Sequence, residues 1–132
     1  MNSLFNKLNV KDDEKILVLN IPKELKNIFD QAHKEGMIID KERMPSTIYK
    51  FALVFVTSID EIGVTASMTA KSLVAENPKF WIAYPKSSSE KYDTDIKKDA
   101  DWEVMAVIGF KMDERIDIDE NWSANKFSRL TK

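Results

Sequence analysis

The sequence predicts an α/β domain of three layers, in which a mainly parallel sheet of five or six strands ends in an antiparallel C-terminal strand. Short, almost uninterrupted apolar runs, typical of strands buried on both faces, occupy 15–20, 51–56 and 79–84. Amphipathic segments with helical spacing separate these runs, as in α/β folds. No helix separates the last two apolar segments, so those two strands should pair antiparallel.

The length of 132 residues indicates one domain that folds without disulfides or metal. We expect residues 1–14, which are polar and of mixed charge, to form a flexible or helical lead-in to a single α/β domain over 15–132.

The first third of the chain predicts a strand, a helix and a second short strand. After the strand at 15–20, Pro22 suits the first turn of a helix, and Gly36 is a plausible terminator of that helix. A short strand could occupy 37–40, and 41–50 should form a loop. The apolar face of the helix comprises Leu25, Ile28, Phe29 and Ala32.

The run at 51–56 is the clearest strand in the sequence, and a helix should follow it. Ser58 or Asp60 can cap that helix, and Asn77-Pro78 stops it. Its apolar stripe comprises Ile62, Ala66, Ala70, Leu73 and Val74.

The last third predicts a strand at 79–84, a helix and two final strands. Asp93 or Thr94 can cap the helix, and Gly109 ends it. We expect strands within 111–119 and 124–130, joined by a connection at 121–123, with Phe127 facing inward. The apolar face of the helix comprises Ile96, Ala100, Val104, Met105 and Ile108.

Composition disfavours several classes of protein. Twenty basic and 22 acidic residues give a net charge of −2 and are interspersed, whereas nucleic-acid binders gather a basic excess on one face. The absence of cysteine excludes thiolate chemistry and fits a reducing cytoplasm. The N-terminus has no apolar run typical of a signal peptide, and the stretch at 51–56 is too short to cross a bilayer. We therefore expect a cytoplasmic protein with no nucleic-acid or membrane partner.

The glycines argue against a nucleotide cofactor. Only three occur, at 36, 63 and 109, so neither a dinucleotide fingerprint nor a P-loop can be built. The turn after the first strand reads Asn20-Ile21-Pro22-Lys23. Pro22 has no N–H to donate, and Ile21 places a branched Cβ where such cofactors usually require glycine. We expect no cofactor.

Residues suited to catalysis or metal binding are few. His33, the only histidine, lies near the end of a predicted helix, where it interacts favourably with the helix dipole. Ser58 follows a strand but lacks the glycines of a nucleophile turn. An acidic run could hold a divalent cation or form a solvated sheet edge, and we favour the edge because Lys111 and Arg115 partly neutralise it. This run comprises Asp113, Glu114, Asp117, Asp119 and Glu120. We expect no metal and no catalytic residue.

Two motifs resemble those of a family of small bacterial proteins of unknown function. The first is a strand that ends in Tyr84-Pro85-Lys86 before a serine-containing loop, and the second is Asp119-x-x-Trp122-Ser123…Phe127-x-Arg129. The match covers 51–129, with 15–25 as a weaker part. That family in turn resembles a shortened Rossmann-type methyltransferase, whose first, fourth, fifth, sixth and seventh strands it retains. The resemblance implies a methyltransferase-like fold without the glycine-rich cofactor loop, and it implies no particular activity.

A ligand site, if present, should lie beyond the carboxyl ends of the parallel strands. The segments expected there are 21–23, 57–58, 84–88 and 120–123, together with the N–H groups of a helix opening at 93–95. The candidate ligand-binding residues are Tyr84, Lys86, Ser87, Ser88, Trp122, Ser123 and Arg129.

The same residues also have a structural interpretation. Tyr84-Pro85 could be a rigid turn, with either a cis or a trans bond, and Trp122 could cover the core with its N–H bonded to a carbonyl. We expect Trp81 and Trp102 to be packing residues.

Our leading functional hypothesis is a non-enzymatic module that binds a small ligand or a protein partner, as a monomer or a homodimer. The alternative is an enzyme acting on a small anionic metabolite, with Lys86 as an electrostatic clamp and Tyr84 or Ser123 in a supporting role. A third possibility is residual binding of the methyl donor or its product.

Overall fold

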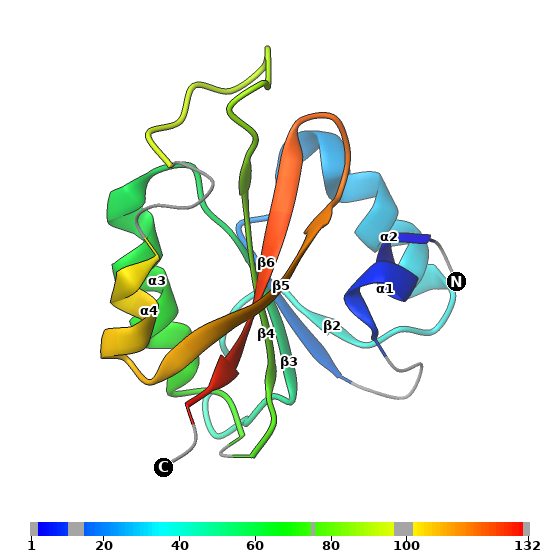
Figure 1. Cartoon of the computed structure of the whole chain (residues 1–132). Coiled ribbons are helices and arrows are strands. Elements are labelled where there is room, and N and C mark those ends of the chain that lie inside the picture. The colour runs from blue at the N-terminus through cyan, green and yellow to red at the C-terminus, as the bar shows by residue number, and fades with distance from the viewer. Residues whose placement is uncertain (1–2, 11–14, 75, 97–101, 131–132) are drawn as a thin grey trace.

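A mixed sheet of six strands forms the centre of the computed structural model (Figure 1), which describes residues 3–10, 15–74, 76–96 and 102–130. The strands lie in the order β2 (Ile39–Asp40), β1 (Ile16–Leu19), β3 (Phe51–Phe55), β4 (Lys79–Pro85), β6 (Trp122–Arg129) and β5 (Phe110–Asp117). The first four strands are parallel, and β6 runs antiparallel to both of its neighbours. The predicted fold class is confirmed.

Helices cover both faces of this sheet, as Figure 1 shows. One face packs against α1 (Ser3–Leu8), the 3-10 turn η1 (Lys23–Leu25) and α2 (Lys26–Lys34). The other face packs against α3 (Ile59–Ala70) and α4 (Glu103–Val107). Alternate residues of β1 and β3 therefore contribute to two separate cores, which explains why both strands are buried along their whole length.

The segment that precedes the first strand contributes to the core. Leu4, Phe5 and Leu8 of α1 are buried, and the ring of Phe5 packs edge-on against Phe29 at 5.6 Å between centroids. Of the two alternatives for this lead-in, the structure shows the helical one over Ser3–Leu8.

The first predicted helix begins and ends where the sequence indicates. Pro22 precedes η1, and Gly36 adopts a φ of +103°, which side chains other than glycine rarely tolerate. The N–H of Met37 donates to the carbonyl of Ala32 at 3.0 Å, closing the helix end.

The capping predictions for the next helix are wrong in detail. Ser58 occupies the N-cap position of α3, but its hydroxyl makes no capping bond. The carboxylate of Glu61 instead accepts the N–H of Thr57 at 2.9 Å, and the carboxylate of Asp95 accepts the N–H of Ile59 at 2.8 Å. The start of α3 is thus capped by a residue from the loop that follows β4.

The third predicted helix is the largest correction. Asp93 and Thr94 do not cap it, because the described part of that helix is α4 alone, at Glu103–Val107. Thr94 donates to the carbonyl of Thr57 at 3.0 Å, and the segment 93–96 is not helical. Part of the predicted helix, including Ala100, falls in 97–101, outside the described residues.

The final strand begins two residues earlier than expected. Trp122 and Ser123 belong to β6, where they pair with Pro85 and Tyr84. Because side chains alternate along a strand, Trp122 faces the core beneath α1 and α2, whereas Ser123 lies on the α3 and α4 side. Leu130 lies beyond the strand and is 48% exposed, while Phe127 is buried as predicted.

Candidate functional site

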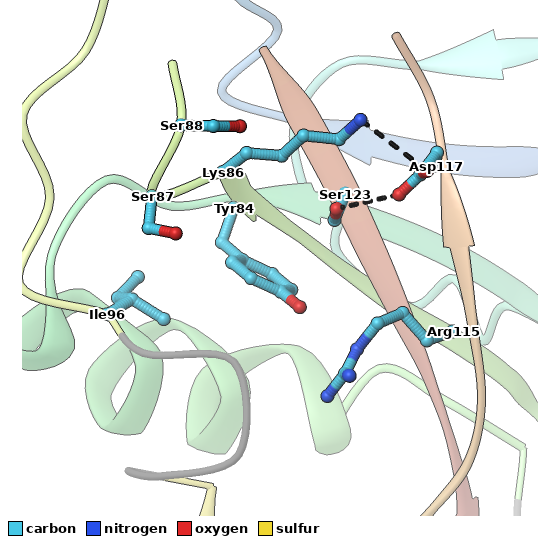
Figure 2. Close-up of a pocket in the computed structure, with 8 residues that line it drawn as sticks. All are labelled: Tyr84, Lys86, Ser87, Ser88, Ile96, Arg115, Asp117 and Ser123. Carbon is cyan, nitrogen blue, oxygen red and sulfur yellow. Dashed lines mark hydrogen bonds and ion pairs between the residues drawn. The ribbon is translucent and has the colours of Figure 1, made fainter. Parts of the chain in front are cut away.

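A cavity of about 300 Å³ lies at the carboxyl end of β4, on the α3 and α4 side of the sheet. Figure 2 shows the side chains that surround it. Tyr84, Lys86, Ser87 and Ser88 come from the end of β4 and the loop after it, Ile96 from later in that loop, Arg115 and Asp117 from β5, and Ser123 from β6.

Antiparallel pairing brings these distant segments together. Ser123 of β6 is the cross-strand partner of Tyr84 on one side and of Asp117 on the other. The sequence order of β5 and β6 is reversed in the sheet, so the start of β6 adjoins the end of β4. Five of the seven predicted ligand-binding residues therefore line one cavity: Tyr84, Lys86, Ser87, Ser88 and Ser123.

A charged pair and a serine form one wall of the cavity. The ammonium of Lys86 lies 3.5 Å from the carboxylate of Asp117. The hydroxyl of Ser123 donates to the other oxygen of that carboxylate at 3.1 Å (Figure 2). The Lys86 side chain is 23% exposed and the Asp117 side chain 70% exposed, so the pair is open to solvent.

Tyr84 and Arg115 line the cavity and are joined beneath it by Asn125. The Oδ1 atom of Asn125 accepts from the Nε of Arg115 at 2.9 Å and from the hydroxyl of Tyr84 at 3.4 Å. Because a guanidinium can only donate, this contact fixes the orientation of the amide. The Nδ2 of Asn125, which is fully buried, then has no protein acceptor.

The phenol of Tyr84 is a neutral group at physiological pH. Burial raises its pKa above the ordinary value, although the charge of Arg115 and the hydrogen bond with Asn125 act in the opposite direction. Tyr84 can therefore donate or accept a hydrogen bond, but it does not supply a phenolate nucleophile near neutral pH.

Trp122 lies outside this cavity. It is 1% exposed, and its Nε1 donates to the carboxylate of Glu24 at 3.1 Å. Tyr92 donates to the same carboxylate at 2.6 Å, and its ring packs against Trp122 at 5.0 Å between centroids. Trp122 thus covers the core, which is the structural alternative to a ligand-binding role. Its N–H donates to a carboxylate, however, and not to the carbonyl that was expected.

This cluster perturbs the acidity of its members. Burial favours protonation of Glu24, but the hydrogen bonds from Tyr92 and Trp122 and the charge of Lys91 outweigh it, so the pKa of Glu24 is lowered. Burial and the neighbouring Glu24 carboxylate raise the pKa of Tyr92 to about 12.

Arg129 lies at the opposite end of β6 from the cavity. Its guanidinium donates to the carbonyl of Val74 at 3.1 Å and to that of Ala70 at 3.3 Å, beyond the end of α3. It also stacks over Phe110 at 4.9 Å from the ring centroid. The structure therefore gives Arg129 a role in closing α3 and does not bring it to the candidate site.

The structure also bears on the other residues and features that the sequence singled out. Trp81 and Trp102 are buried, and His33 is exposed at the end of α2. The Tyr84–Pro85 bond is trans. Within the described residues, no group of acidic or histidine side chains is arranged to hold a metal ion. Nor is any described helix long and apolar enough to span a membrane.

Sequence reasoning missed three polar residues of the site. Arg115 and Asp117 were considered only as part of an acidic run, and Asn125 was not considered. The signal was available in the spacing: 115 and 117 of one strand, and 123 and 125 of the next, alternate onto one face of an antiparallel pair.

The fold class raises the question of whether the chain could hold the methyl donor of methyltransferases. At the turn after β1, Asn20 has a φ of +61° and binds the carbonyl of Phe55 through its side chain at 3.3 Å. Ile21 packs against the core, Pro22 has no N–H, and the Glu24 carboxylate at the start of the next helix is already bonded to Tyr92 and Trp122. These residues do not fit a nucleoside cofactor at this turn.

Several solved structures similar to this chain are named as methyltransferases. A putative type 11 methyltransferase from Sulfolobus solfataricus has a TM-score of 0.60 at 11% identity, covering 98% of this chain and 91% of its own. A ribosomal-protein methylase from Lactobacillus delbrueckii subsp. bulgaricus has 0.59 at 9%, covering 97% and 76%. The N-methyltransferase NodS from Bradyrhizobium japonicum has 0.52 at 8%, covering 89% and 86%. The chain has a Rossmann-like methyltransferase fold.

Identities this low show the fold and carry no activity with them. No family model and no curated protein matches the sequence. The expected methyltransferase-like core is confirmed, whereas membership of a bacterial family of unknown function stays a prediction.

Proposed function

We propose that the chain is a non-enzymatic module that binds a small anionic ligand in the cavity between the ends of β4, β5 and β6. The observation that carries this proposal is the convergence of two cations on one cavity that also presents several hydroxyls. Lys86 and Arg115 supply the positive charge, and Asp117 is the one acidic side chain among the described lining residues.

The lining suits a small ligand with one net negative charge. The described lining residues, two cations and one carboxylate, have a formal charge of +1, and charge-assisted hydrogen bonds to cationic side chains are about twice as strong as neutral ones. Ser87 and Ser88 are exposed and can donate to further oxygens of the ligand. The volume of about 300 Å³ is at the lower end for small-molecule pockets, which favours a compact ligand.

The enzyme alternative draws on the same residues. Lys86 would hold an anionic substrate, with Tyr84 or Ser123 in a supporting polar role. Two observations favour binding alone. The Ser123 hydroxyl donates to Asp117 with no imidazole to activate it, and burial keeps the Tyr84 phenol neutral. Docking of a protein partner, a homodimeric state and a cytoplasmic location also stay predictions.

Titration calorimetry and thermal shift with formate and sulfate test this proposal. We expect binding to the wild-type chain that weakens at least fivefold in Lys86→Ala, because a charge-assisted contact is lost. Lys34→Ala is the matched control: it removes the same charge from an exposed position on α2, away from the cavity, and should bind as the wild type does.

The proposal fails if neither anion binds, or if the two lysine variants weaken binding equally. A broad screen for phosphatase, esterase and methyl-transfer activity separates the alternatives. Turnover that is lost in Lys86→Ala would replace the binding module with an enzyme.

A further inference from the structure

The cavity contains its own anion. Asp117 is the last residue of β5, and its carboxylate lies against the ammonium that the proposed ligand would bind (Figure 2). A ligand anion that approaches Lys86 must share it with Asp117 or displace Asp117. The ligand and Asp117 therefore compete for the same ammonium group of Lys86.

Asp117 is held in this position by the strand pair. Ser123 is 6% exposed and donates to one carboxylate oxygen of Asp117, while Lys86 approaches the other oxygen. The backbone carbonyl of Asp117 also accepts from the Nζ of Lys7 at 3.2 Å. These contacts hold Asp117 in the wall of the cavity, although its side chain is 70% exposed.

We propose that Asp117 sets the charge selectivity of the anion site, weakening the binding of every anion and of dianions most. This inference rests on the proposed function and concerns its ligand class. The interaction between two charges is proportional to each of them, so a ligand of charge −2 is repelled by Asp117 twice as strongly as a ligand of charge −1. Asp117 should accordingly reduce the advantage in affinity that dianions such as phosphate monoesters gain over monoanions such as carboxylates from Lys86 and Arg115.

The test uses Asp117→Asn, which keeps the shape of the side chain and removes its charge. Affinities for formate, a monoanion, and sulfate, a dianion, are measured by calorimetry at one constant ionic strength. Because Asp117 is exposed to solvent, we expect Asp117→Asn to bind formate with about threefold higher affinity than the wild type. Doubling the ligand charge doubles the gain in binding free energy, so the increase in affinity for sulfate should be the square of that for formate, roughly ninefold.

Asp113→Asn is the control, since it removes the same charge from the same strand outside the cavity. Asp113 is exposed, and its carboxylate accepts from Ser128. This variant should change neither affinity by more than the experimental error. Thermal unfolding of both variants verifies that they are folded.

Each outcome has a distinct meaning. A gain in affinity in Asp117→Asn that is larger for sulfate than for formate supports the inference. An unchanged affinity, an equal gain for both ions, or the same gain in Asp113→Asn overturns it while leaving the binding site intact. If neither anion binds the wild type, the proposed function fails, and the inference that rests on it fails too.

Discussion

Glu24 accepts hydrogen bonds from two aromatic side chains that are distant in sequence. Tyr92 and Trp122 follow it by 68 and 98 residues, and both donate to its carboxylate. Hydrogen bonds to a charged group contribute more than neutral ones, about 1.5–3 kcal/mol where solvent is excluded. At the residue scale, this carboxylate connects the turn after β1 to the loop after β4 and to the start of β6.

Tyr92→Phe should lower the free energy of unfolding by about 1–2 kcal/mol near neutral pH, because it removes the phenol that donates to Glu24. The folded pKa of Tyr92, about 12, lies above the ordinary value of 10.0. The stability linked to this proton is therefore complete below pH 10 and is lost as the pH rises towards 12. Urea unfolding from pH 8 to 12 should show this loss in the wild type, and a similar loss in Tyr92→Phe would contradict the assignment.

Glu24→Gln addresses the acid side of the same cluster. The folded pKa of Glu24 lies below the ordinary value of 4.5, so its contribution to stability is present above that pH and is lost as the pH falls through the folded value. We expect the stability of Glu24→Gln to depend less steeply on pH below 4.5 than that of the wild type. Asp113→Asn is the comparison variant, because it removes a carboxylate from the edge strand β5.

At the scale of elements, Arg129 connects the end of β6 to the chain that leaves α3. It donates to three carbonyls, those of Ala70 at the end of α3 and of Leu73 and Val74 in the chain that follows. Arg129→Lys keeps the charge but cannot reproduce the planar set of donors, and it should cost about 1–2 kcal/mol.

Urea unfolding measures this cost as a lower midpoint at an unchanged slope. Arg43→Lys is the control, because among the described residues the guanidinium of Arg43 donates only to the sulfur of Met68. Equal midpoints for Arg129→Lys and the wild type would show that the helix end does not depend on this guanidinium.

The strands and most helix limits could be predicted because their signals are local. Continuous apolar runs specified β1, β3 and β4, and Gly36 specified the end of α2. The loop after β4 was not predictable in this way. Thr94, a predicted helix cap, instead donates to the carbonyl of Thr57, 37 residues away. Its neighbour Asp95 accepts the N–H of Ile59, 36 residues away.

The candidate site was predicted to a similar degree. The end of β4 contributed Tyr84, Lys86, Ser87 and Ser88 as expected. Trp122 was misplaced because, once β6 begins at that residue, alternation sends its side chain to the opposite face from Ser123. Arg115 and Asp117 entered the site through the pairing of β5 with β6, which a charge count along the sequence does not reveal.

At the scale of the whole molecule, the sheet has a methyltransferase-like fold in which the turn after β1 does not fit a nucleoside cofactor. Ile21, Pro22 and Glu24 occupy that turn, and the open cavity begins two strands away, at the end of β4, and extends to β6 and β5. We expect calorimetry with the methyl donor at millimolar concentration to show no binding heat. Heat that disappears in a variant of the turn, such as Pro22→Gly, would contradict this account.

The most direct test of the central claim is an amide chemical-shift titration of the 15N-labelled chain with formate, which reports where an anion binds. The account predicts shifts at residues 86–88 and at Arg115, Asp117 and Ser123, with none at residues 20–24. Shifts centred on residues 20–24, with the β4–β6 cavity unaffected, would contradict it.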